Sequence, residues 1–235
     1  MTHQSESPVI FSGKLAIIVG GSDCDLQHLK QWVDHTGADV FAADGGVHHC
    51  LKAGLDIVAV IGDMDSASAD VRDSLGQDTD WVEVSEQETT DLEKLLMRLK
   101  YHSVLGFGFL DRRFDHALAA LSVLVRYAPS HNIILVGGDD VLHVTNRSVH
   151  LKIPSGSRLS VWPLSEVCFE SSQGLVWPVD GMVMHPEGQV GTSNRTCQDR
   201  VSLIPSRASD GYFAVMAAHQ HLPAFIDAFH RDSAG

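Results

Sequence analysis

Cysteine is scarce in this chain, and its four cysteines stand far apart without forming a CxxC pair. This spacing argues against a structural zinc site and against a disulfide framework. No apolar run reaches the length of a membrane-spanning helix. The first residues, MTHQSESP, lack the basic-then-apolar pattern of a secretion signal. We therefore expect a cytoplasmic protein that does not bind a membrane.

Positive charge is also in short supply. The 235 residues include 17 Lys and Arg against 30 Asp and Glu, which gives a formal net charge of −13. So acidic a surface argues against general binding to nucleic acid or to anionic lipid. The acidic residues are scattered, which is typical of a soluble surface. A hydrophobic content of 44% is enough to build the core of one large domain or of two small ones.

The first part of the chain alternates short apolar runs with helical patterns. Runs that are apolar throughout and are separated by helices indicate a parallel sheet covered on both faces. We therefore expect an α/β domain with a mostly parallel sheet and flanking helices over residues 1–145. The expected strands are 14–19, 39–43, 57–61, 104–108 and 133–136, and the expected helices are 25–35, 47–53, 89–100 and 114–127.

The pattern changes after about residue 145. Short alternating segments such as RLSVWPLS and RVSLIPS are separated by Pro, Gly, Ser and Asn. This texture predicts a small antiparallel β domain over residues 146–235, with a short helical tail at 222–230.

Residues 89–100, TTDLEKLLMRLK, give the clearest helical pattern. Four leucines recur at the spacing of one helix face. Thr90 and Glu93 have the spacing of a capping box, so the helix should begin near Thr89 or Thr90. In residues 114–127 a second apolar stripe is expected, formed by Phe114, Leu118, Leu121 and Val125.

Acidic residues recur at one kind of position along the expected sheet. They are Asp44 after the second strand, Asp63 and Asp65 after the third, and Asp91 and Asp115 in the first turns of helices. Strand carboxyl ends and helix amino ends share the edge of a parallel sheet where ligands bind. Because Asp63 and Asp65 would repel each other, a cation is expected between them. Carboxylate oxygens combined with phosphate oxygens suit Mg²⁺.

Each acid taken singly also has a plainer interpretation. Asp63 or Asp65 can cap a turn, and Asp91 can simply complement the dipole of its helix. Lys94, one turn after Asp91, can meet a phosphate or form a solvated salt bridge. Asp44 resembles the acid of a dinucleotide site, but the G-x-G-x-x-G motif of such sites is absent. The recurrence of acids at one predicted edge favours the metal site.

Two arginines stand out in this acidic chain, at the junction GFGFLDRRFDH. Arg112 and Arg113 can be surface residues, or they can bind phosphate through paired hydrogen bonds. Together with a carboxylate-bound Mg²⁺ they suit a nucleoside triphosphate. The chain has neither a Walker A motif nor the protein-kinase motifs, so any phosphoryl chemistry must use another scaffold.

The order of these motifs resembles the thiamine pyrophosphokinase family. That family carries ADGG, GDxDS, a TD helix start, R-[FL]-D-[HQ], a G-L-x-W-x-[LV] segment and a TSN segment, in this order. The matching residues here are 43–46, 61–66, 90–94, 113–116, 174–179 and 192–194.

The resemblance implies transfer of a pyrophosphoryl group from ATP to thiamine, giving thiamine diphosphate and AMP. It also implies Mg²⁺ as cofactor, a C-terminal β-sandwich that binds thiamine and a homodimer. Residue by residue, it implies Mg²⁺ and catalytic roles for Asp63, Asp65 and Asp91, catalytic roles for Arg113 and Asp115, ATP binding by Asp44, Thr90, Lys94 and Arg113, and thiamine binding by Trp177, Thr192, Ser193 and Asn194. The arginine pair itself, and not the resemblance, adds Arg112 to the expected ATP-binding residues.

Some positions leave alternatives open. Arg112 stands where the family usually has Gly. The arginine can add a phosphate contact or alter the shape of the loop. Trp177 can equally be a core residue of the sandwich, and either Asp91 or Asp115 can accept the thiamine hydroxyl proton. Two other functions remain: a Mg²⁺-dependent transferase of the DxD type, and a non-catalytic protein that binds thiamine or a nucleotide.

Overall fold

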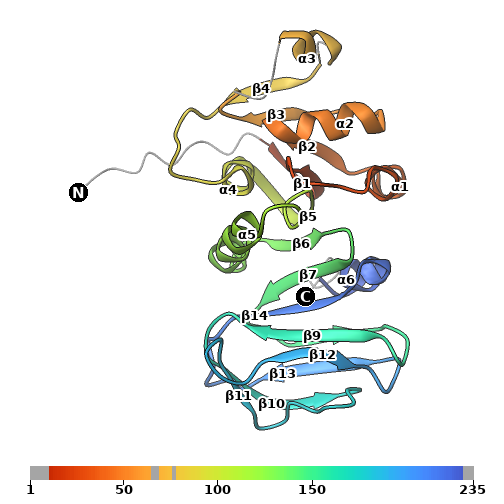
Figure 1. Ribbon diagram of the computed structural model, residues 1–235, viewed down its shortest axis with the longest axis vertical. Coiled ribbons are helices and arrows are strands. Elements are labelled where there is room, and N and C mark those ends of the chain that lie inside the picture. The colour runs from red at the N-terminus through yellow and green to blue at the C-terminus, as the bar shows by residue number, and fades with distance from the viewer. Residues whose placement is uncertain (1–10, 65–68, 76–77, 230–235) are drawn as a thin grey trace, which may run out of the picture. The chain divides into compact units, whose positions relative to one another are not determined.

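The computed structural model (Figure 1) describes residues 11–64, 69–75 and 78–229. The chain divides into two compact units between Val123 and Leu124. The functional boundary that the sequence places near residue 145 stays a prediction.

A parallel sheet forms the first unit. Its strands, in spatial order, are β5 (Leu99–Phe107), β1 (Phe11–Val19), β2 (Asp39–Ala43), β3 (Ala59–Gly62) and β4 (Asp80–Glu83). Residues 16–19 of β1 are fully buried, which is why an uninterrupted apolar run marks this strand in the sequence.

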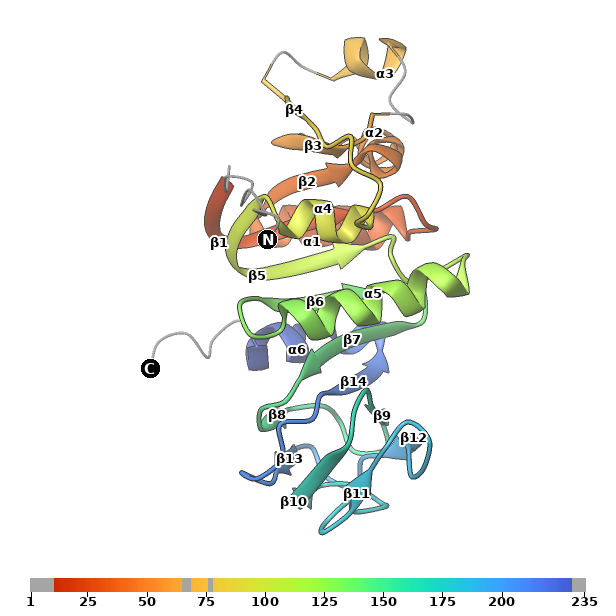
Figure 2. The same ribbon diagram turned by 90° about the vertical axis from the view of Figure 1, so that its left-hand side faces the viewer.

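Helices cover both faces of this sheet. The helices of this unit are α1 (Leu26–Thr36), α2 (Val47–Ala53), α3 (Ala69–Ser74), α4 (Asp91–Leu96) and the start of α5 (Phe114–Tyr127), with the short 3-10 helix η1 (Asp44–Gly46) before α2. In Figure 2, α4 lies in front of the sheet, and α1 and α2 lie behind it. Asp25 caps α1 by accepting hydrogen bonds from Gln27 N and His28 N. Gly37 ends α1 in the left-handed conformation, with φ of 59°.

The leucine-rich helix is shorter than predicted. Thr90 caps α4 as expected, by accepting a hydrogen bond from Glu93 N. The helix ends at Leu96, and Leu99 already begins β5, where it pairs with Phe11 of β1. Strand pairing with β1 therefore outweighs the helical pattern of residues 97–100.

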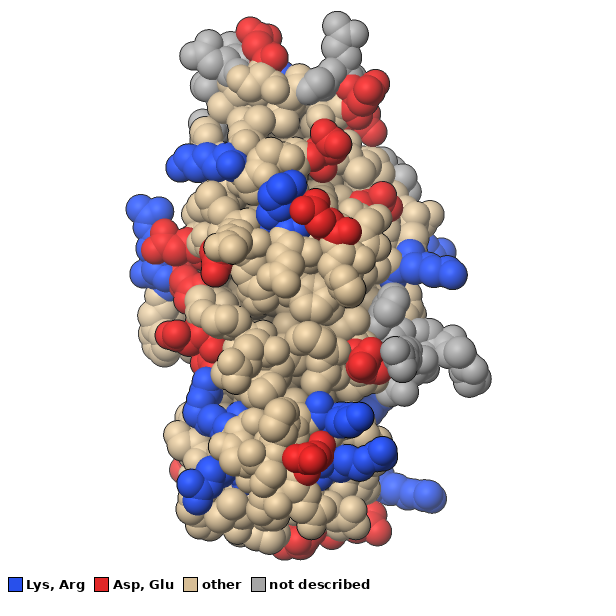
Figure 3. All heavy atoms as spheres, turned by 90° about the vertical axis from the view of Figure 1, so that its right-hand side faces the viewer, with Lys and Arg blue, Asp and Glu red and all other residues tan. Residues whose placement is uncertain are grey.

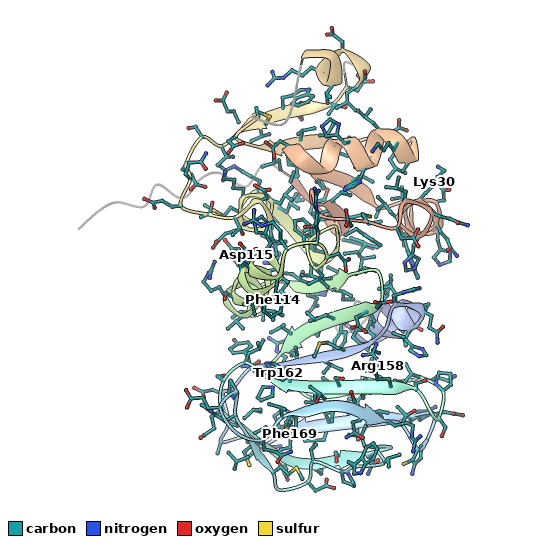
Figure 4. The ribbon with its side chains drawn as sticks, viewed as in Figure 1. Lys30, Phe114, Asp115, Arg158, Trp162 and Phe169 are labelled. Atoms are coloured by element: carbon teal, nitrogen blue, oxygen red, sulfur yellow. The ribbon has the colours of Figure 1, made fainter. Side chains whose placement is uncertain are left out.

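Two antiparallel sheets form the second unit. One contains β12 (Gly191–Arg195), β9 (Arg158–Pro163), β14 (Phe213–Ala218), β7 (Asp140–Thr145) and β6 (Asn132–Val136), and the other contains β11 (Val183–Met184), β10 (Val167–Gln173), β13 (Val201–Pro205) and β8 (Val149–Leu151). The rings of Phe169 on β10 and Phe213 on β14 meet with centroids 4.9 Å apart. Phe169 thus lies between the sheets (Figure 4), as in a β-sandwich. The 3-10 helix η2 (His219–His221) and α6 (Leu222–Phe229) follow. An α/β unit followed by an antiparallel sandwich is the predicted fold class.

The apolar stripe expected on α5 is exposed in its first half, whereas Leu121 and Val125 are half-buried. Phe114 is 78% exposed and Leu118 is 49% exposed. The residues of this helix that are buried are instead Ala120, Val123 and Leu124. Phe114 and Asp115 mark the start of the helix in Figure 4. An exposed apolar stripe is typical of a surface that another chain covers.

Charges of both signs are interspersed on the face shown in Figure 3, in keeping with the scattered acidic residues of the sequence. Within the part of the chain that the structure describes, no helix has the length and apolar character needed to cross a membrane.

Candidate active site

A cavity of about 680 Å³ opens at the carboxyl edge of the parallel sheet, within the first unit. The segments that follow β1, β2 and β5 form part of its wall, together with the start of α4 and the first turns of α5. Of the residues singled out in the sequence, it is lined by Asp44, Thr90, Asp91, Arg112 and Arg113; Gly21, Gly45, Gln87, Gly108 and His116 are among its other lining residues.

Asp44 is held in the wall of this cavity, with only 5% of the residue exposed. Its Oδ1 accepts a hydrogen bond from Gly45 N at 2.8 Å. A Cβ at Gly62 would lie 3.1 Å from Asp44 Cγ, closer than ordinary contact. Glycine at position 62 therefore lets the Asp44 carboxylate lie beside the end of β3, one residue before Asp63.

Asp63 is joined to two polar side chains from other segments. Gln87 Nε2 donates a hydrogen bond to Asp63 Oδ2 at 2.9 Å, and Lys94 Nζ lies 3.8 Å from the same oxygen. Lys94 is 2% exposed. The lysine is therefore a buried partner of Asp63, and the solvated salt bridge considered from the sequence is wrong.

Asp91 is exposed and lines the cavity, and the protein atoms around its carboxylate partly desolvate it. Burial raises its pKa; the charge of Lys94 opposes that rise, the charge of Asp63 adds to it, and the charge of His116 opposes it. Asp63 and Asp91 thus interact as like charges across this edge. The structure brings Asp44, Asp63 and Asp91 together, as the positions of these acids along the sequence predict.

Arg113 and Asp115 form a bidentate pair at the surface. Arg113 Nη2 lies 2.6 Å from Asp115 Oδ2, and Nε donates to Oδ1 at 3.1 Å. The hydrogen bond from Arg113 lowers the pKa of Asp115. Arg113 lines the cavity, whereas Asp115 is exposed and does not line it. Among the acids singled out in the sequence and described here, Asp44 and Asp91 therefore line the cavity, whereas Asp63 and Asp115 do not.

The residues implied in thiamine binding lie in the second unit. Trp177 is 57% exposed, which shows that its interpretation as a sandwich-core residue is wrong. Asn194 is buried, and its side chain brackets the Trp177 backbone: Nδ2 donates to Trp177 O at 2.6 Å and Oδ1 accepts from Trp177 N at 3.2 Å. Thr192 and Ser193 are exposed. Asn194 therefore fixes the backbone that presents the indole ring.

Left-handed backbone at non-glycine residues is confined to three places in the described chain. Met64 has φ of 66°, Arg112 of 72° and Ser193 of 56°. Each belongs to, or directly precedes, a motif singled out in the sequence. Such strain persists where the surrounding structure imposes it, and it gathers at functional sites.

The described residues give an incomplete metal site. No group of three histidine, cysteine or acidic side chains within residues 11–64, 69–75 and 78–229 is arranged to hold a metal ion. Asp65, the second acid of the GDMDS motif, lies outside the described residues. The donors that are described still fit Mg²⁺, because Asp63 and Asp91 are hard oxygen ligands whose mutual repulsion a cation would relieve.

Two residues of this edge were not assigned a site role from the sequence. Gln87 binds Asp63, and His116 lines the cavity and acts on Asp91. Neither has a spacing that signals its role. Gln87 lies between two glutamates in a segment without regular periodicity, and His116 reads as a helix-surface residue.

Comparison with known proteins agrees with this architecture. Residues 30–136 match the family model for the thiamin pyrophosphokinase catalytic domain. The chain is similar to thiamine pyrophosphokinase 1 of Arabidopsis thaliana, with 28% identity over 161 residues, 60% of this chain and 59% of that protein. It therefore spans less than two thirds of the length of this relative.

Solved structures give the same fold. A thiamin pyrophosphokinase from Geobacillus thermodenitrificans superposes with a TM-score of 0.74 and 23% identity, covering 87% of this chain and 97% of that one. The Bacillus subtilis thiamine pyrophosphokinase gives a TM-score of 0.74 and 19% identity, covering 87% and 99%. The sequence match over residues 30–136 and the shared fold confirm the resemblance to the thiamine pyrophosphokinase family that the motifs indicate.

Proposed function

We propose that the protein is a thiamine pyrophosphokinase that transfers a pyrophosphoryl group from ATP to the hydroxyl of thiamine, giving thiamine diphosphate and AMP. The observation that carries this proposal is the cavity at the carboxyl edge of the parallel sheet. Acidic and cationic side chains from separate segments meet there: Asp44, Asp91, Arg112 and Arg113 line it. Both kinds of charge are needed to hold a metal-bound polyphosphate.

The polyphosphate of ATP is held by backbone and by cations. Gly21, Gly45 and Gly108 let the main chain approach a ligand closely. Arg113 supplies a guanidinium at the cavity wall, and Asp115 fixes its orientation through the bidentate pair. Thr90 caps α4 and lines the same wall. These groups bind and align the phosphates for in-line transfer.

Mg²⁺ would be held by Asp63 and Asp91, with Asp65 as the further ligand implied by the motif, and would neutralise charge on the phosphate oxygens. Lys94 and Gln87 orient the Asp63 carboxylate through Oδ2. Asp44, anchored by Gly45 N, adds a fixed negative charge at the same edge.

Asp91 is the better placed acceptor for the thiamine hydroxyl proton. It lines the cavity, whereas Asp115 is exposed outside the cavity lining and is engaged by Arg113. A general base must reach the proton it removes. Asp115 then acts by orienting Arg113.

Thiamine recognition is assigned to Trp177, Thr192, Ser193 and Asn194. Thiamine carries a cationic thiazolium ring, and an exposed indole face is a favourable partner for such a ring. The exposed stripe of Phe114 and Leu118 supports the homodimer that the family resemblance implies. We also propose a cytoplasmic location for this enzyme.

A product assay tests this proposal. Purified protein is incubated with ATP, Mg²⁺ and thiamine, and the products are identified by mass spectrometry. Thiamine diphosphate and AMP are expected in equal amounts. Release of UDP from a sugar nucleotide, without thiamine diphosphate, would instead support the DxD-type transferase. Binding of ATP and thiamine without any product would support the non-catalytic alternative.

A further inference from the structure

Arg112 has a backbone conformation that favours glycine. Its φ is 72°, in the left-handed region, and it follows β5 at the wall of the cavity. A side chain in this region has an energetic cost that glycine avoids. Backbone strain of this kind gathers at functional sites, which indicates a functional role for the Arg112 side chain.

The Arg112 guanidinium is not engaged by the rest of the described chain. It is exposed and lines the cavity, and no hydrogen bond or ion pair joins it to another described residue. The neighbouring cations differ in this respect. Arg113 is paired with Asp115, and Lys94 is paired with Asp63. Arg112 therefore offers the cavity a cation with all of its donors available to a ligand.

A free guanidinium at this wall favours the most highly charged ligand. A nucleoside triphosphate carries several negative charges along its phosphates, whereas AMP carries a single phosphate. The attraction of one cation grows with the charge that faces it, and guanidinium makes strong hydrogen bonds to phosphate oxygens.

We propose that Arg112 is a specificity-determining residue that binds the polyphosphate and makes the cavity prefer a nucleoside triphosphate over AMP. The proposal rests on the ATP site of the proposed function. Arg112, despite its strained backbone, supplies a second cation at this site in addition to Arg113. The same preference helps AMP to leave once the pyrophosphoryl group has been transferred.

Nucleotide binding by the full chain, measured by calorimetry with Mg²⁺ and without thiamine, tests this role independently of turnover. The probes are ATP, AMP and inorganic tripolyphosphate. The variants are Arg112→Gln, which removes the charge and keeps the strain, Arg112→Gly, which removes both, and Arg112→Lys, which keeps the charge. Arg207→Gln, at an exposed position of the second unit, is the matched control for loss of one positive charge.

We expect Arg112→Gln and Arg112→Gly to bind ATP and tripolyphosphate about 10-fold more weakly, with AMP binding changed less than about 2-fold. Arg112→Lys should recover part of the loss, and Arg207→Gln should bind as the parent does. Arg112→Gly should also raise Tm by about 2–4 °C, because it relieves the backbone strain. Weaker ATP binding by a more stable variant would not arise from loosened folding.

Equal losses for ATP and AMP, or unchanged ATP binding by Arg112→Gln, would overturn the role. A loss in Arg112→Gly alone would assign the effect to loop shape and would overturn it too. The outcome is separate from that of the product assay. If the protein forms no thiamine diphosphate but its Arg112 variants show the ATP-selective loss, the role of Arg112 stands and the proposed function fails. If it forms thiamine diphosphate but its Arg112 variants show no such loss, the proposed function stands and the role of Arg112 fails.

Discussion

Lys94 Nζ lies 3.8 Å from Asp63 Oδ2, and the lysine side chain is almost wholly buried while the aspartate is partly accessible. The pair joins the first turns of α4 to the end of β3. Lys94 also opposes the rise in the pKa of Asp91. One buried ammonium thus compensates two carboxylates at the candidate active site.

Lys94→Met should abolish most activity while leaving the fold in place. Methionine fills the volume of the buried stem but removes the charge that offsets Asp63 and Asp91. We expect the rate of thiamine diphosphate formation to fall about 100-fold. The free energy of unfolding should change by no more than about 1 kcal/mol, because Asp63 is partly hydrated. Steady-state kinetics and urea unfolding measure the two effects, and near-normal turnover would contradict the assignment.

Asp63→Asn should remove turnover and leave a folded protein. It also leaves the Lys94 ammonium buried without its counter-charge, which costs about 2 kcal/mol of stability. The double variant Asp63→Asn with Lys94→Met should lose less than the sum of the single variants, with a coupling of about 1–3 kcal/mol. Additive unfolding free energies, within about 0.5 kcal/mol, would show that the pair is not coupled.

Gly62→Ala should impair turnover more than stability. The new Cβ would lie 3.1 Å from Asp44 Cγ and 3.2 Å from Asp44 Oδ1, so the carboxylate must shift by a few tenths of an ångström. We expect activity to fall about 10-fold, since small displacements of catalytic groups are costly. The loss of unfolding free energy should stay below about 1 kcal/mol.

Gly188→Ala provides the matched control for that substitution. A Cβ at Gly188 would have its nearest contacts with His185 at 3.9 Å, an ordinary distance. This variant should keep the activity and the stability of the parent. If Gly62→Ala behaves in the same way, the position of Asp44 does not depend on the missing Cβ.

Much of the α/β unit could be predicted because its signals are local. The strand β2 and the helices α2 and α5 have the predicted bounds, since apolar patterns mark them directly and glycine follows β2 and α2. The meeting of Asp44, Asp63 and Asp91 follows from topology, because the carboxyl ends of parallel strands share one edge. These acids therefore lie at the same edge although they are far apart in the sequence.

What the sequence could not supply depends on long-range packing. Leu99 has the spacing of the leucine helix, yet pairing with Phe11 makes it part of a strand. From its position in the sequence, Lys94 can meet a phosphate or form a solvated salt bridge, and only the fold shows its buried contact with Asp63. Phe114 and Leu118 of the stripe expected on α5 are exposed, whereas Ala120, Val123 and Leu124 are buried. For Leu99 and Lys94 the deciding partner lies far away in the sequence.

Asn194→Ala should weaken thiamine binding through Trp177. The substitution leaves the backbone N–H and C=O of Trp177 without their partners, at a cost of about 1–3 kcal/mol of stability. We expect KM for thiamine to rise about 10-fold with a small change in kcat, because the indole is no longer held in place. Kinetics with varied thiamine, together with thermal unfolding, measure this.

Trp177→Ala separates binding from stability at the same place. The ring is 57% exposed, so its removal should raise KM for thiamine by a similar factor and leave Tm almost unchanged. If Asn194→Ala lowers Tm but leaves KM for thiamine unaltered, the Asn194 contacts are structural only.

Acid should destabilise the second unit through His143. Burial lowers the pKa of this imidazole to about 4, Nδ1 donates to Ile133 O at 2.8 Å, and the ring stacks on Phe229 with centroids 3.8 Å apart. The unfolded chain takes up a proton near its ordinary pKa of about 6.5, before the folded chain does. The stability contributed by neutral His143 is therefore complete above that pH and is lost as the pH falls from about 6.5 towards 4.

Between pH 7 and pH 5 this loss amounts to about 2 kcal/mol of unfolding free energy. His143→Phe keeps a ring against Phe229 and cannot take up a proton. It should be less stable at pH 7, because Ile133 O loses its donor, but its stability should fall less steeply with acid. Urea unfolding at both pH values measures the difference between the two slopes. Parallel slopes for parent and variant would mean that His143 is not the group whose protonation opposes folding.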